Sequence, residues 1–265
     1  MAAHDKTLTY GSYLRLDELL ALQQPRSTGP EHDEMLFIVV HQVYELWFKQ
    51  VLHELRALRT ALDAGSSSRS LAALKRVLTI LKTLVAQVDV IETMTPVSFN
   101  SFRARLEAAS GFQSAQFREI ETLLGHKRPQ VLDAHPAGSP ARARLEALLA
   151  EPSVFDAFLR YLERCGYAVP PGVLARDVRQ ALEPSAAVQE LLLEAYRRDD
   201  FAAQLCERLV DLDEGLQEWR YRHVKMVERT IGAKIGTGGS AGAAYLRQTL
   251  FRPLFPDLWE IRSRL

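Results

Sequence analysis

Apolar residues recur at every third or fourth position along most of the chain, the spacing that places them on one face of an α-helix. The pattern is strongest in two long stretches, residues 33–62 and about 201–231. A further long helix is predicted over residues 71–93, after a glycine- and serine-rich turn at residues 65–70. The sequence has no stretches in which apolar and polar positions alternate, as they do in half-buried strands. It therefore predicts an all-α fold, a bundle-like domain built on long helices.

Shorter helices are predicted after the second long one. Thr95 followed by Pro96 is a helix-start signal, because a threonine side chain caps the first turn and proline is favoured at the first helical position. Ser110 and Gly111 interrupt the helical pattern, and another helix is predicted over residues 113–124. These signals indicate two short helices that follow one another closely.

The middle of the chain differs from the rest. Residues 126–198 begin with a loop that contains three prolines and two histidines, and continue with short helical pieces separated by prolines. We expect a single domain over residues 1–265, in which residues 126–198 form a lesser helical excursion. Residues 1–30 are expected to form an N-terminal helix.

Charge and cysteine content exclude several classes of partner and site. The 265 residues include 33 lysines and arginines and 33 aspartates and glutamates, so the formal net charge is zero and no general field attracts nucleic acid or an anionic membrane. Apolar runs are shorter than the roughly 18 residues that cross a bilayer, and the polar start of the chain lacks the apolar segment of a signal peptide. The two cysteines form no CxxC motif. We expect a cytoplasmic protein without nucleic-acid or membrane partners.

One histidine lies within the apolar face of the late helix. Seven residues follow one another there at alternating spacings of four and three, which predicts a continuous buried face: Leu205, Leu209, Leu212, Leu216, Trp219, His223 and Met226. Cations such as Arg220 and Lys225 flank this face, so His223 is expected to point inward. Two interpretations remain open. His223 is either a core histidine satisfied by one hydrogen bond or an axial ligand of a metal, since neutral imidazole is a common ligand.

A second inward histidine, His41, lies on the first long helix among Phe37, Tyr44 and Phe48. Two such histidines on two helices suggest a cofactor held between the helices, although each alone is more often structural. A di-iron carboxylate site requires Glu-x-x-His pairs and a zinc protease requires HExxH, and the sequence has neither. Haem requires only one protein ligand on iron and a mostly apolar pocket, so haem is the cofactor that these residues permit.

Polar candidates for ligand binding lie elsewhere. Residues 236–242, GTGGSAG, lack the Lys-Ser/Thr pair of a phosphate-binding loop and follow a helix. They form either a flexible linker or, through backbone amides and the Thr237 hydroxyl, a site for a small anion. The guanidinium of Arg103 suits a carboxylate, unless Arg103 is an ordinary surface residue. In the simplest interpretation, Tyr10 and Tyr13 pack the first helix onto the core.

Five strings of the sequence resemble the tryptophan 2,3-dioxygenase family. In chain order, which is also the family's order, they are YGSYLRLDELL, HDEMLFIVVHQVYELWFKQVLHEL, ETMTPVSFNSFRARLEAASGFQSAQFREIE, WRYRHVKMVERTIG and GTGGSAGAAYL. They extend from residue 10 to about residue 246, and only residues 126–198 match loosely. ASGFQSAQFR, and the pairing of RHVKMVERTIG with GTGGS, are long and specific motifs.

The resemblance implies an enzyme with one haem b per subunit that inserts both atoms of O2 across the indole C2–C3 bond of L-tryptophan. The product would be N-formylkynurenine, in the first step of tryptophan degradation. His223 would be the axial ligand of the haem iron. His41 would accept a hydrogen bond from the indole N–H and orient the ring, more than act as an obligatory base. Phe37 would pack on the indole, Arg103 would pair with the substrate carboxylate, and Thr237 would contact its ammonium and carboxylate end.

The same resemblance extends to the distal side of the haem and to the subunit assembly. Ser110 and Gly111 match residues that lie against the haem on its distal side. Tyr10, Tyr13 and Leu14 match an N-terminal helix that, in this family, completes the substrate pocket of a neighbouring subunit. The assembly implied is a homotetramer, a dimer of dimers.

Phe99 stands at a substrate-binding position where family members carry Tyr or Phe, and phenylalanine lacks the hydroxyl that would reach the carboxylate. Two alternative functions remain open. A related haem oxygenase would act on a substituted tryptophan or a modified indole in secondary metabolism, but an indole without a carboxylate would not require Arg103 and Thr237. A non-catalytic haem sensor or helical scaffold would not require His41 or the carboxylate-binding residues.

Overall fold

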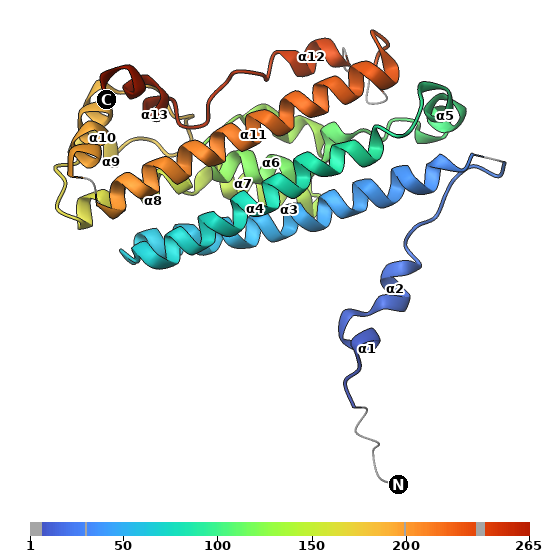
Figure 1. Ribbon diagram of the computed structural model, residues 1–265, viewed down its shortest axis with the longest axis horizontal. Coiled ribbons are helices and arrows are strands. Elements are labelled where there is room, and N and C mark those ends of the chain that lie inside the picture. Colours follow the sequence, from blue (N-terminus) through green and yellow to red (C-terminus); the bar gives the residue numbers. More distant parts are fainter. Residues whose placement is uncertain (1–6, 30, 199, 237–241) are drawn as a thin grey trace.

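Three long helices form the body of the molecule. The structure is a computed structural model that describes residues 7–29, 31–198, 200–236 and 242–265. Helix α3 (Asp33–Asp63) runs in one direction, and α4 (Ser67–Ile91) and α11 (Phe201–Ile231) run in the other (Figure 1). In the described ranges every regular element is a helix, which confirms the predicted all-α fold. None of these helices combines the length and apolar content needed to cross a membrane.

The remaining helices are shorter. In chain order they are α1 (Tyr10–Leu14), α2 (Leu16–Leu20), α5 (Pro96–Phe102), α6 (Ala115–Leu123), α7 (Pro140–Ala150), α8 (Val154–Arg164), α9 (Pro171–Leu174), α10 (Ala186–Arg198), α12 (Ala243–Arg247) and α13 (Pro256–Glu260). Single 3₁₀ turns follow α5 at Arg103–Leu106, precede α6 at Gly111–Gln113 and α7 at Pro129–Ala134, and end the chain at Ile261–Arg264. Helices α1 and α2 extend away from the bundle, whereas α6, α7 and α8 lie behind α3 and α4 in Figure 1.

The long helices are held together by one hydrophobic core. Leu58 of α3, Val77 of α4 and Leu205 of α11 are fully buried within it, and so are Phe158 of α8 and Leu192 of α10. The residues predicted as an excursion, 126–198, therefore supply side chains to the same core as the long helices. The division of the chain into one domain with an excursion stays a prediction.

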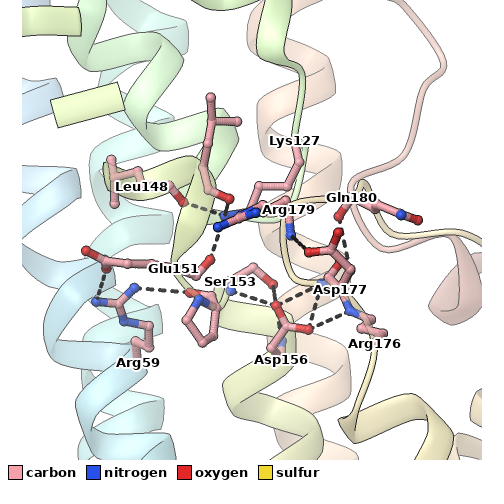
Figure 2. A network of polar contacts seen from close by, with 12 residues as sticks. Arg59, Lys127, Leu148, Glu151, Ser153, Asp156, Arg176, Asp177, Arg179 and Gln180 are labelled. Atoms are coloured by element: carbon pink, nitrogen blue, oxygen red, sulfur yellow. Dashed lines mark hydrogen bonds and ion pairs between the residues drawn. The ribbon is translucent and has the colours of Figure 1, made fainter. Parts of the chain in front are cut away.

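Polar contacts also tie this middle region to α3 (Figure 2). The buried ammonium of Lys127 donates to the carbonyl oxygens of Leu148 and Glu151 at the C-terminal end of α7, the second at 2.7 Å. Arg59 of α3 forms an ion pair with Glu151 at 2.8 Å and donates to the Pro152 carbonyl oxygen at 3.1 Å. Since the last carbonyls of a helix lack their usual partners within it, the Lys127 ammonium supplies a donor at the end of α7, and Arg59 joins the following residues to α3.

Three sequence-based element boundaries need correction. Helix α4 begins at Ser67, not at residue 71, because the Ser70 hydroxyl bonds to the Ser66 carbonyl oxygen at 2.9 Å and Ser70 is buried inside the helix. The N-terminal helix predicted over residues 1–30 is broken at Arg15, whose φ of 52° is left-handed. Helix α6 starts two residues later than predicted, because the Ser114 side chain caps it.

Candidate active site

A cavity lies between α3 and α11, and four of the predicted site residues line it. His41 reaches it from α3 and His223 from α11, while Ser110 and Gly111 line it from the segment before α6. The position of Ser110 and Gly111 follows from local chemistry, because the Ser110 side chain caps the 3₁₀ turn that begins at Gly111. The structure therefore brings together two histidines that are far apart in the sequence.

His223 is the more isolated of the two histidines. Its ring stacks on Trp219, one helical turn earlier, with centroids 5.3 Å apart and planes 8° from parallel. Burial, together with the nearby His41 and Arg118, lowers the pKa of His223 to about 4. Among the residues that the structure describes, none hydrogen-bonds to this imidazole. A neutral imidazole with a free lone pair, facing a cavity, is suited to ligate a metal ion.

His41 has a fixed orientation. Its Nδ1–H donates to the Phe37 carbonyl oxygen at 2.7 Å, and since a carbonyl only accepts, Nδ1 must carry the proton in the neutral ring. Burial lowers the pKa of His41 and so favours that neutral form. The Nε2 atom is consequently left as a hydrogen-bond acceptor, the role that sequence resemblance implies for it.

Aromatic rings form one wall of the cavity. Phe117 lies 5.4 Å from Phe48 and 4.8 Å from Trp219, measured between ring centroids, and Tyr44 lies 6.1 Å from Trp219. The indole nitrogen of Trp219 is buried and has no hydrogen-bond partner in the described part of the chain. The apolar spacing places Trp219 on the buried face of its helix, but no local pattern indicates Phe117, which reaches the cavity from α6.

A buried charged cluster, which the sequence pattern does not indicate, forms the other side of the cavity. Glu121 forms ion pairs with Arg118 at 2.5 Å, Arg220 at 2.7 Å and Arg128 at 2.9 Å. Burial alone would raise the pKa of Glu121, but the guanidinium groups of Arg118, Arg220 and Arg128 more than offset it and hold the pKa at about 2. With three cations and one anion, the cluster carries excess positive charge beside the cavity. We refer to these four residues as the arginine cluster.

The arginine cluster corrects one expectation. Arg220 was expected among the cations that flank the buried face, yet its side chain is only 5% exposed and lines the cavity. The spacing of Arg118 and Glu121, three residues apart on α6, was the only local signal of the cluster. Arg128 and Arg220 join it from other parts of the chain, which no spacing rule would indicate.

Two further predicted residues, Phe37 and Phe99, pack beside His41 without lining the same cavity. The Phe37 ring lies 4.1 Å from the ring of His41 and 5.8 Å from that of Phe99, and it also contacts Phe102. Arg103 directly follows Phe102, at the end of α5. One N–H of Arg103 donates to the carbonyl oxygen of Ile235, just beyond α11.

The other predicted site residues lie apart from the cavity or outside the described ranges. Thr237 belongs to residues 237–241, which lie outside them. Tyr10, Tyr13 and Leu14 lie on α1, and the two tyrosines are 75% and 71% exposed. The interpretation that Tyr10 and Tyr13 pack onto the core of their own chain is therefore wrong. We call residues 7–22, which include α1 and α2, the N-terminal arm.

The donor set favours a cofactor that needs a single protein ligand. In the described ranges no three histidine, cysteine, aspartate or glutamate side chains come close enough together to hold a metal ion by themselves. A haem iron needs only one such side chain, and His223 is free to provide it. The carboxylate groups of a haem would also find excess positive charge in the arginine cluster. The residues present therefore fit a haem.

Comparison with known proteins agrees with these observations. The model of the family described as "Tryptophan 2,3-dioxygenase" matches residues 2–135 and 173–265. The chain is 64% identical over 264 residues to the tryptophan 2,3-dioxygenase of Anaeromyxobacter sp. (strain K), an alignment that covers 100% of this chain and 98% of that protein. It is 62% identical over 260 residues to that of Herpetosiphon aurantiacus, with 98% and 99% covered. The stretch that the family model leaves out, 136–172, lies within the region that resembles the family only loosely.

Proposed function

The chain belongs to the tryptophan 2,3-dioxygenase family, and on that premise we propose that it inserts both atoms of O2 across the C2–C3 bond of the indole ring of L-tryptophan and releases N-formylkynurenine. One observation from the structure carries the proposal beyond family membership. His41 and His223 face one cavity from opposite helices, one as an oriented hydrogen-bond acceptor and the other as a free ligand. A sensor or a scaffold would need only the second of these.

The cofactor we propose is haem b, one per subunit, in keeping with the haem dependence of the family. His223 would ligate its iron, Ser110 and Gly111 would line the space it occupies, and Arg118 and Arg220 would supply positive charge for its carboxylates. When bound, the haem supplies the iron that activates dioxygen. The pKa of His223, about 4, keeps the imidazole neutral at physiological pH, so no proton has to leave before it ligates.

Recognition of the substrate is assigned to the residues around His41. Its Nε2 atom would accept the indole N–H, because Nδ1 is already committed to the Phe37 carbonyl oxygen. The Phe37 ring, beside that of His41, offers an apolar surface to the indole, and Phe99 extends this surface. These groups fit a flat bicyclic side chain with a single N–H donor.

Arg103 is assigned to the substrate carboxylate. A guanidinium has five N–H donors, and the contact with the Ile235 carbonyl oxygen leaves others for a bidentate pair with two carboxylate oxygens. Thr237 is assigned to the ammonium and carboxylate end, as the resemblance implies. A site that binds both ends of the amino acid rejects an indole without a carboxylate, because the binding group would stay unpaired.

We further propose that the protein assembles as a homotetramer, a dimer of dimers, in the cytoplasm. The N-terminal arm supports assembly, since Leu8, Tyr10, Tyr13, Leu20 and Leu22 are all exposed and no residue of α1 or α2 is buried. Apolar and aromatic side chains exposed together typically mark an interaction site. Tyr10, Tyr13 and Leu14 would then complete the substrate site of a neighbouring subunit. Neither cysteine forms a disulfide, as is usual in a reducing compartment.

The decisive experiment measures turnover on two indoles. The protein, loaded with haem and reduced to the ferrous state, is mixed with oxygen and either L-tryptophan or tryptamine, which lacks only the carboxylate. We expect N-formylkynurenine from L-tryptophan, followed by its absorbance and identified by mass spectrometry, and little turnover of tryptamine. A normal haem spectrum without product from L-tryptophan would refute the proposal. Equal turnover of both compounds would favour a modified indole as the substrate.

A further inference from the structure

The N-terminal arm leaves the bundle at the start of α3, and the contacts at that point decide its direction. Glu34, in the first turn of α3, accepts hydrogen bonds from the backbone N–H of Arg26 at 2.6 Å and of Ser27 at 2.9 Å. The Ser27 hydroxyl donates to the same carboxylate. Both carboxylate oxygens of Glu34 are thus occupied by donors from the residues that connect the arm to the helix.

A second contact holds the same connection further along α3. Gln42 lies eight residues after Glu34, which is about 12 Å along the helix axis. Its side chain accepts a hydrogen bond from Gln23 at 2.5 Å and donates one to the Leu22 carbonyl oxygen at 3.2 Å. Two attachments separated along one rigid helix fix a direction as well as a position. The arm accordingly points away from its own bundle (Figure 1).

Glu34 is an unusual residue for this place. Glu34 is only 1% exposed, and within the described ranges its carboxylate forms no ion pair with a cation. A buried carboxylate is costly unless it is hydrogen-bonded, and the donors here come from Arg26 and Ser27. If the connection took another path, the charge would lose these partners. The buried carboxylate of Glu34 therefore favours the path of the chain that keeps these donors in place.

A simpler role for Glu34 would be to start α3, since an acid in the first turn is stabilised by the helix dipole. Asp33 supplies the same charge in the same turn, and its side chain makes no hydrogen bond to the described part of the chain. The first turn thus contains two acids, of which only Glu34 contacts the connection to the arm. This difference separates the two roles experimentally.

We propose that Glu34 is a positioning residue that directs the arm of its own chain to the substrate site of a second copy of this chain. The inference rests on the proposed function, in which exposed side chains of the arm complete a neighbour's site. Glu34 acts through the backbone of Arg26 and Ser27. A misdirected arm would leave the neighbour's substrate site incomplete, while the haem ligand His223, on α11, would be unaffected.

The test compares Glu34→Gln with the matched control Asp33→Asn in the full-length, haem-loaded protein. Glutamine has the same shape as glutamate, but its amide nitrogen is a donor, and it would face the backbone N–H of either Arg26 or Ser27. Both substitutions remove one negative charge from the first turn of α3. Three measurements are made: the mass of the assembly by native mass spectrometry, the amide exchange of residues 8–22, and the steady-state kinetics (KM and kcat) with L-tryptophan.

For Glu34→Gln we expect faster exchange of residues 8–22, a smaller fraction of assembled protein, and a KM raised on the order of tenfold, the factor expected for one lost hydrogen bond to a charged group. The haem spectrum should stay that of the unchanged protein, and Asp33→Asn should resemble the unchanged protein in all three measurements. If Glu34→Gln and Asp33→Asn behave alike, Glu34 only starts the helix and the proposal is overturned. Amide exchange and the mass of the assembly test the role of Glu34 even if the protein has no dioxygenase activity. A failure of the proposed function can therefore be told apart from a failure of this proposal.

A mixing experiment adds an independent test of the second copy. Subunits with Glu34→Gln, which keep an intact haem site, are co-expressed with Arg103→Ala subunits, which keep an intact arm. We expect the mixed assembly to exceed the mean activity of the two separate variants, because arms of the second subunit complete sites of the first. Activity equal to that mean would show that the arm serves its own chain, which contradicts the proposal.

Discussion

The arginine cluster provides the most quantitative test of how the cavity is built. Replacing Glu121 by glutamine removes the carboxylate that three guanidinium groups share, and within the described part of the chain it leaves these buried or half-buried cations without another ion-pair partner. The pKa of Glu121, about 2 against an ordinary 4.5, corresponds to a net stabilisation of the carboxylate of about 3 kcal/mol, after its partners have offset the cost of burial. Breaking one partner out of a buried ion pair costs about 3–5 kcal/mol by general experience, which is the same size.

The assay for Glu121→Gln is equilibrium unfolding in urea. A loss of about 3 kcal/mol lowers the unfolding midpoint by about 1 M urea if the slope is about 3 kcal/mol per M. The measurement is made without added haem and again with saturating haem, because a ligand that binds only the folded state adds stability of its own. An unchanged midpoint in both conditions would refute the reasoning that this carboxylate stabilises the cavity wall.

Glu119 on the same helix offers a matched control. It is also buried, and it pairs with Arg56 at 3.4 Å and Arg144 at 2.8 Å, but these two arginine side chains are 47% and 51% exposed. After Glu119→Gln, both arginines can turn into water, so we expect a loss of at most about 1 kcal/mol. If Glu119→Gln and Glu121→Gln lower the free energy of unfolding equally, burial of the partner arginines does not determine the cost of losing the carboxylate.

The pH dependence of the same variants checks the sign of the effect. Because the folded-state pKa of Glu121 is depressed, the unfolded chain binds more protons between about pH 4.5 and 2, so the stabilisation is complete above this range and is lost as the pH falls through it. The difference in stability between the unchanged protein and Glu121→Gln should therefore shrink across this range. A difference that grows on acidification would contradict the ion-pair account.

Three further predictions concern other parts of the molecule. His223→Ala should abolish haem retention after desalting, whereas His41→Ala should keep the haem and slow turnover, and equal haem loss in both would contradict their roles. Arg103→Ala should raise KM for L-tryptophan by about a hundredfold, the factor for a lost bidentate pair with a carboxylate, and an unchanged KM would exclude that contact. Lys127→Met should lower stability by about 2–3 kcal/mol in urea unfolding, because buried carbonyl oxygens at the end of α7 lose their donor. The exposed Lys75→Met is the control and should change it by less than about 0.5 kcal/mol.

The long helices were predictable because their signal is repeated many times. The spacing of apolar residues predicted residues 33–62 and 201–231, and the structure has Asp33–Asp63 and Phe201–Ile231. Boundaries that depend on one residue were less predictable. The serines within residues 66–70 favour a turn by composition, yet Ser70 is buried and α4 begins at Ser67. The left-handed backbone of Arg15 has no sequence signal.

The histidines could be predicted from local sequence, whereas the arginine cluster could not. His41 and His223 were visible because each interrupts an otherwise apolar helix face, a local pattern. The pairing of Glu121 with Arg220 joins residues 99 positions apart and arises only when α6 packs beside α11. A charged residue with no partner nearby in the sequence is expected on the surface, so the sequence predicts a flanking cation at Arg220, whereas the structure buries it against Glu121.

Helix α4 explains how two histidines on different helices keep a constant separation. It packs against both α3 and α11. Tyr44, one turn after His41, donates its hydroxyl to a backbone carbonyl of α4 at 2.9 Å. Arg222, next to His223, donates to Glu92 at the end of α4 at 3.2 Å. Because each histidine has a neighbour bonded to the same third helix, moving α3 away from α11 would break one of these contacts. The acceptor and the free ligand are thus held in place by a helix that supplies neither histidine, and such support is what a site needs in order to be preorganised before its ligands bind.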